Sequence, residues 1–114
     1  MLNDSQHLDR AFSALADPVR RGMLARLSQG PASVSQLAEP FSISLPAILQ
    51  HLKSLEDGGL VRSEKKGRVR TVQLEPKSLS AAESWIADRR IEWEAQLDRF
   101  ETYLQTLKKS GEIE

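Results

Sequence analysis

The spacing of apolar residues changes twice along this chain, and these changes constrain the fold more than any other feature. Up to Asp57 the apolar residues recur three or four positions apart, which is the period of an α-helix. From Leu60 to Leu74 they alternate, as in a β-strand, and after Pro76 the helical spacing returns. The pattern predicts a mainly α chain in which a small β-hairpin precedes a long last helix.

Residues 8–28 predict the first two helices. An apolar stripe over residues 8–15 marks the first. Asp17 and Pro18 then restart the chain, because aspartate suits an N-cap and proline suits the first helical position. The second helix stops before the Gly-Pro pair at residues 30–31.

Residues 33–58 predict two further helices joined by a tight link. Ser33 can cap the first, and Gln36 three residues later completes a capping box. Ser44 can cap the second, with Pro46 in the first turn, where a missing N–H is not needed. The apolar residues at helical spacing in this second helix are expected to face inward: Ile48, Leu52 and Leu55.

Residues 60–74 predict the hairpin, with a turn over Lys65–Arg68 and Val72 and Leu74 on one face. Five basic residues against one acid lie between Arg62 and Arg70. The net charge of the whole chain is zero, but residues 1–74 hold ten Lys/Arg against seven Asp/Glu. A local patch of charge sets the electrostatic field that a phosphate group meets, so the basic hairpin suits a nucleic acid. The alternative is an ordinary solvated hairpin, since lysines around a glycine are common there as well.

The last predicted helix is capped by Ser78 or Ser80 and runs to about Lys109. Its apolar residues follow a heptad spacing of four, three, four and three, as in helices that pair. A chain of 114 residues has too little surface of its own to cover this seam and the stripe near the N-terminus. We therefore expect a homodimer. Its predicted interface residues are Leu8, Phe12, Leu15, Trp93, Leu97, Phe100, Leu104 and Leu107.

Two short helices, a tight link and a charged hairpin are the elements of a winged helix-turn-helix, whose second helix enters the major groove of DNA. Gln50 can pair with adenine, while thymine methyls can be touched by Leu45, Pro46, Ala47 and Leu49. Leu45 and Leu49 are alternatively core residues. His51 is interpreted as a phosphate contact or a packing residue rather than a metal ligand. Arg70 shares a strand face with Val72, so its stem can pack while its head reaches outward. The predicted contacts to double-stranded DNA are Ser44, Leu45, Pro46, Ala47, Leu49, Gln50, His51, Lys53, Lys65, Lys66, Arg68 and Arg70.

Four segments resemble the ArsR/SmtB family of regulators: Ala14–Arg21, Ser44–Val61, Lys66–Leu74 and Trp85–Leu104. The resemblance covers about residues 8–108. It implies a single winged helix-turn-helix domain over residues 1–114, with five helices, a two-stranded wing and a dimerisation helix over 78–109. It also implies a homodimeric repressor that binds an inverted-repeat operator.

The chain departs from the metal-sensing members of that family. It has no cysteine, and its last helix has no histidine. Asp88, Glu92 and Glu94 could hold a hard cation in principle, but a solvated acidic helix face is the simpler interpretation. We therefore expect no metal site, no cofactor and no metal response, and the sequence indicates no inducer.

Other functional classes find less support. Two histidines, no cysteine and no glycine-rich phosphate loop argue against an enzyme. No apolar run is long enough to span a membrane and no secretory signal is evident, which together with the missing cysteines predicts a cytoplasmic protein. The alternative is a winged-helix module that binds another protein and has no specific affinity for DNA.

Overall fold

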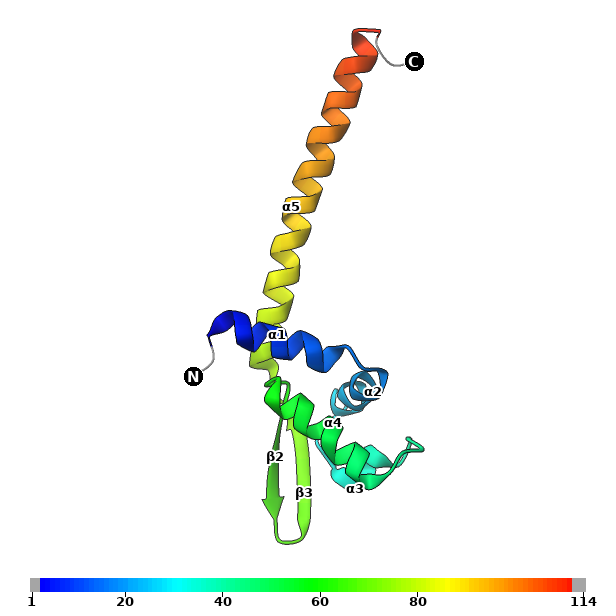
Figure 1. Ribbon diagram of the computed structural model, residues 1–114, viewed down its shortest axis with the longest axis vertical. Coiled ribbons are helices and arrows are strands. Elements are labelled where there is room, and N and C mark those ends of the chain that lie inside the picture. The colour runs from blue at the N-terminus through cyan, green and yellow to red at the C-terminus, as the bar shows by residue number, and fades with distance from the viewer. Residues whose placement is uncertain (1–2, 112–114) are drawn as a thin grey trace. The chain divides into compact units, whose positions relative to one another are not determined.

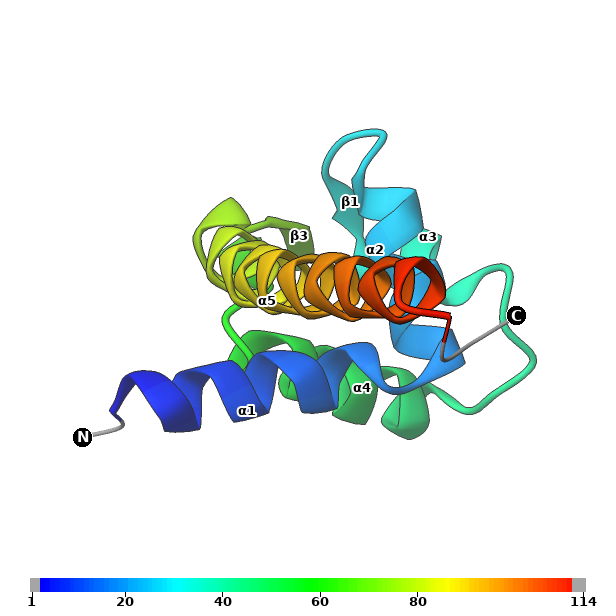
Figure 2. The same ribbon diagram turned by 90° about the horizontal axis from the view of Figure 1, so that it is seen from above.

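The computed structural model describes residues 3–111 and contains five helices and three strands; Figure 1 labels the helices and the two longer strands, and Figure 2 labels the short strand β1. The elements are α1 (Asp4–Leu15), α2 (Pro18–Leu27), β1 (Ala32–Ser33), α3 (Val34–Ala38), α4 (Leu45–Asp57), β2 (Val61–Lys66), β3 (Val69–Leu74) and α5 (Pro76–Lys109). They form two compact units, Met1–Ala82 and Glu83–Glu114. The first holds the helix-turn-helix and the wing, and the second is the rest of α5. The mainly α fold with a β-hairpin is confirmed.

Three helix starts lie where the capping residues predict them. Asp17 caps α2, and its Oδ2 accepts hydrogen bonds from two backbone N–H groups. Ser33 and Gln36 form the expected capping box at α3. Ser44 caps α4, its Oγ accepting from the N–H of Ala47 at 3.3 Å. These helices begin at fixed points because a side chain satisfies donors that the first turn leaves free.

Two other helix starts were predicted wrongly. α1 begins at Asp4, four residues before Leu8, because Asn3 and Gln6 form a capping box ahead of the apolar stripe that starts at Leu8. α5 begins at Pro76, so neither Ser78 nor Ser80 is its N-cap. The hydroxyl of Ser80 donates instead to the carbonyl of Pro76 at 3.0 Å, a bond made inside the helix. Proline at the first helical position needs no donor there, which explains the earlier start.

The sheet has three strands rather than two, in the order β1-β3-β2, and both pairings are antiparallel. The extra strand pairs Ala32 with Val72. The predicted four-residue turn is also wrong, because β2 continues to Lys66 and only two residues separate it from β3. The first of these, Gly67, has φ of 62°, a conformation that glycine adopts without strain in such a turn.

One hydrophobic core holds the first unit together. Its largest fully buried side chains come from α2, α3, α4, the segment after α4 and β3: Met23, Leu37, Ile48, Leu55, Leu60 and Val72. α1 packs along α4 (Figure 2), and the approach is close at Gly58. A Cβ there would lie 2.9 Å from the carbonyl oxygen of Arg10. These contacts cover one side of α4 and fix its position in the unit.

In the second unit, α5 carries large apolar side chains that are exposed. They are Trp85, Ile86, Ile91, Trp93, Leu97, Phe100 and Tyr103. Among the described residues, no helix is both long and apolar enough to cross a membrane.

Candidate nucleic-acid interface

The first two turns of α4 present apolar side chains to solvent. Leu45 is 56% exposed and Leu49 is 41% exposed, so neither is a core residue. The inward face of the same helix buries Ile48, Leu52 and Leu55, as the sequence predicts. Since residues 45 and 49 are one helical turn apart, they lie on the same face.

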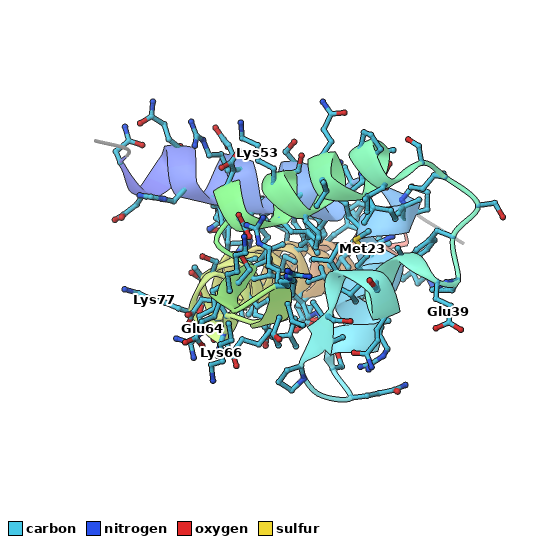
Figure 3. The ribbon with its side chains drawn as sticks, turned by 90° about the horizontal axis from the view of Figure 1, so that it is seen from below. Met23, Glu39, Lys53, Glu64, Lys66 and Lys77 are labelled. Carbon is cyan, nitrogen blue, oxygen red and sulfur yellow. The ribbon has the colours of Figure 1, made fainter. Side chains whose placement is uncertain are left out.

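The other α4 residues predicted to contact DNA differ in exposure and in whether their side chains already form hydrogen bonds. Gln50 and Lys53 are exposed, and Lys53 points outward from α4 in Figure 3. Ser44 and Pro46 are also exposed, whereas Ala47 is half-buried. The Oγ of Ser44 is already the N-cap acceptor. Gln50 is therefore the exposed amide of α4 that can form two bonds to one base.

His51 packs against α2. It is half-buried, and its Nδ1 lies 3.2 Å from Nη1 of Arg20 and 3.8 Å from Oδ2 of Asp17. Because a guanidinium only donates, Nδ1 is the acceptor in the first contact. Arg20 also donates to the carbonyls of Ser13 and Ala14 at the end of α1. This geometry gives His51 a packing role that joins α4 to α2.

The same contacts stabilise the charged form of Asp17. The backbone N–H of Arg20 and, to a lesser extent, that of Val19 donate to its carboxylate and hold its pKa below the ordinary value. The positive charge of Arg20 acts in the same direction, while desolvation opposes it.

We expect Asp17 to make the stability of the protein dependent on pH. A carboxyl whose pKa is lower in the folded state stabilises that state above its unfolded pKa, about 3.9, and loses this effect as pH falls through the folded pKa. The Tm difference between the natural protein and Asp17→Asn should be greatest near pH 7 and shrink below about pH 4. A difference that is constant from pH 3 to pH 7 would contradict this, because asparagine also caps helices but carries no charge.

The wing projects three free basic side chains. Lys65 and Lys66 lie at the end of β2 and Arg68 lies in the turn, and all three are exposed. Figure 3 shows Lys66 pointing away from the rest of the unit.

Arg70 differs from Lys65, Lys66 and Arg68 because its guanidinium has partners within the unit. Its Nη2 lies 3.0 Å from Oε1 of Glu56 in α4, and its Nε donates to the Oγ of Ser63 at 2.9 Å. Ser63 in turn donates to Glu56 at 2.6 Å. The guanidinium therefore joins the wing to α4, a partnership that the strand pattern did not reveal.

The structure adds two exposed apolar residues that the sequence analysis missed. Ile43, in the link before α4, is 40% exposed, and Val69 at the start of β3 is 54% exposed. The signal for Ile43 is its place directly before the N-cap Ser44, where it has no helical neighbours to bury it.

The predicted dimer residues fall into two groups. In α1, Leu8, Phe12 and Leu15 are half-buried, and the fully buried positions are Ala11 and Ala14. In α5, Trp93, Leu97 and Phe100 are more than half exposed, while Leu104 and Leu107 are half-buried. Ile86, which the prediction omitted, lies seven residues before Trp93 and extends the α5 seam by one heptad.

The acidic residues of α5 are partly engaged with cations. Glu92 accepts a hydrogen bond from Arg89 at 2.8 Å, and the Arg89 guanidinium lies 5.0 Å from the ring centre of Trp85. Within residues 3–111, His, Asp and Glu side chains form no group of three or more that could hold a metal ion.

Known proteins resemble this chain over most of its length. A helix-turn-helix domain family matches residues 15–64. The HTH-type transcriptional regulator Rv2034 of Mycobacterium tuberculosis is 38% identical over 109 residues, which cover 91% of this chain and 92% of that protein. The transcriptional repressor SdpR of Bacillus subtilis is 30% identical and covers 69% of this chain and 88% of its own length.

Solved structures agree with the fold. The crystal structure of an ArsR family transcriptional regulator, RHA00566, is 47% identical with a TM-score of 0.77, over 82% of this chain and 97% of that one. A homodimeric winged helix-turn-helix DNA-binding domain from Mycobacterium bovis, solved by NMR, has a TM-score of 0.61 at 24% identity, over 80% and 92% of the two chains.

Proposed function

This chain belongs to the ArsR/SmtB family of winged helix-turn-helix transcriptional regulators, and from that premise we propose that it represses transcription by binding an inverted-repeat operator as a homodimer. The observation that carries the proposal is the pairing, in one unit, of an exposed α4 face with a basic wing. Regulators of this family are not enzymes, and the chemistry of the site is that of binding.

The two parts of the interface have different tasks in this proposal. The exposed face of α4 enters the major groove, where Gln50 bonds a base edge. The wing places Lys65, Lys66 and Arg68 on phosphates or in the minor groove. α4 therefore supplies sequence choice, and the wing supplies affinity for any duplex.

Dimerisation follows from the exposed apolar seam of α5. A soluble chain rarely leaves so many large apolar side chains in water unless a partner covers them. Their heptad spacing suits a second copy of the same helix, and the related domain from M. bovis is a homodimer. Two copies related by a two-fold axis would read two halves of an inverted repeat.

The proposal is tested by selecting bound duplexes from a random-sequence pool, followed by titration of the selected duplex and a transcription reporter that carries it. We expect an inverted repeat, affinity that falls steeply with salt, and lower reporter output in the presence of the protein. A module that binds only proteins would select no sequence and would show no salt-dependent affinity for DNA.

Arg68→Ala should weaken binding to selected and random duplexes alike. Each lost phosphate contact should reduce the slope of log affinity against log salt by about one unit. The matched control is Lys109→Ala, which removes one exposed charge at the end of α5 and should leave the slope unchanged. Unequal loss on the two duplexes would mean that Arg68 reads sequence.

We also expect operator affinity to be indifferent to transition metals. The chain has no thiolate ligand and too few histidines to make a site of three or four ligands. Titration of the operator with and without stoichiometric Zn²⁺, Cu²⁺ or Ni²⁺ should give the same Kd. A reversible tenfold change would point to carboxylate ligands shared between two copies.

A further inference from the structure

We propose that α4 recognises its operator through the C5-methyl groups of thymine, by apolar contact in the major groove, in addition to the bonds of Gln50. This inference rests on the proposed function and specifies the half-site that the protein prefers. It concerns four residues, Ile43, Leu45, Pro46 and Leu49, which we call the apolar reading face.

The apolar reading face is exposed although the unit has a well-formed core. Ile43, Leu45 and Leu49 are 40–56% exposed, whereas the inward residues of α4 are at most 4% exposed. The core therefore does not need these side chains. Large apolar groups gathered at one end of a helix in this way mark an interaction surface.

The charges around this surface favour DNA as the occupant. Lys53 lies one turn beyond Leu49 on α4 and is exposed, and the wing of the same unit adds Lys65, Lys66 and Arg68. No acidic residue lies between Phe41 and Leu55. A polyanion fits such a surface better than a neutral or basic partner does.

Little hydrogen-bonding capacity is left at this end of α4. The Oγ of Ser44 serves as the N-cap, and Nδ1 of His51 faces Arg20 and Asp17. Of the predicted base readers, Gln50 and Lys53 remain. The exposed apolar side chains at this end of α4 therefore outnumber the free amide and ammonium groups that could bond a base edge.

Thymine offers the one apolar group on the major-groove edge of an unmodified base pair, its C5-methyl. Uracil pairs in the same way but lacks that methyl, so replacing thymine by uracil removes only this contact. Burying one methyl-sized group contributes about 0.8 kcal/mol, which corresponds to about a fourfold change in Kd. Three such contacts in a half-site would together change Kd by about 60-fold.

The experiment uses the full chain and the duplex selected from a random pool, resynthesised with uracil at one thymine at a time. We expect about a fourfold weakening at each thymine that faces α4 and none elsewhere. In the variant Leu49→Ala, the effect of uracil should disappear at one or two of these positions. Alanine preserves the helix but removes the side chain that contacts the methyl group, so removing that methyl from the base should no longer change the affinity.

Val69→Ala is the matched control, because Val69 is as exposed as Leu45 but lies on the wing. It should leave every uracil effect unchanged, since the minor groove and the phosphates carry no methyl. A selected motif that binds equally well with uracil or thymine would overturn this inference and leave the proposed function intact. A pool that yields no motif would overturn both.

Discussion

Replacing Leu97 and Leu104 together by aspartate should lower operator affinity by about 10²–10⁴-fold. Both residues lie on the α5 seam, and Leu97 is 65% exposed in the single chain. Four carboxylates would then meet in the paired helices, where burial of unpaired charge is costly. The resulting monomer would engage one half-site and lose the gain from binding two linked half-sites.

Sedimentation and titration on the same samples check this expectation. The control is the double variant Thr102→Asp and Gln105→Asp, which adds the same charge to exposed positions of α5 off the seam. It should stay dimeric and bind normally. Circular dichroism should show that both variants remain largely helical. A natural chain that is monomeric at micromolar concentration, or a monomeric variant with full affinity, would refute the proposed dimer.

Gln50→Ala should cost about 1–3 kcal/mol on the selected operator and little on random duplex. The reason is that Gln50 can bond an adenine through both its carbonyl and its amide, and alanine leaves that base without its partner. The ratio of specific to random affinity should therefore fall by up to about 150-fold.

Gln29→Ala provides the comparison, because it removes an exposed glutamine that lies outside α4, after α2. It should change neither affinity. Titrations of both duplexes at several salt concentrations separate the roles of helix and wing. If Gln50→Ala weakens both duplexes equally while Arg68→Ala weakens only the operator, the two roles are the reverse of those proposed.

The sequence predicts those parts of the fold that depend on neighbours a few residues away. Asp17 and Ser44 were identified as caps because each precedes a helical apolar pattern and satisfies donors within the next turn. Asn3 caps in the same way, but no apolar residue between Asn3 and Leu8 indicates a helix there, so the sequence pattern does not predict the start of α1. β1 was missed because two residues have no detectable period and form a strand only through pairing with β3.

The candidate site was predictable to a similar degree. The sequence assigned α4 and the wing to the interface but left Leu45 and Leu49 open between core and surface, which their exposure resolves. The sequence analysis also grouped Arg70 with Lys65, Lys66 and Arg68 as a basic residue of the wing that contacts DNA. The partner of Arg70 is Glu56, fourteen residues earlier, and only the folded chain brings the two together.

The contacts among Glu56, Ser63 and Arg70 hold the base of the wing against the last turns of α4 in the free protein. A hinge at this point would have to be frozen when DNA binds, and that loss of conformational entropy would weaken the complex. Because these contacts are already made in the free protein, α4 and the wing meet the DNA with their relative positions held. In the proposed complex, a duplex whose shape does not match this arrangement would have to bend or twist, and the stiffness of base pairs that the protein never touches would then contribute to the choice of operator.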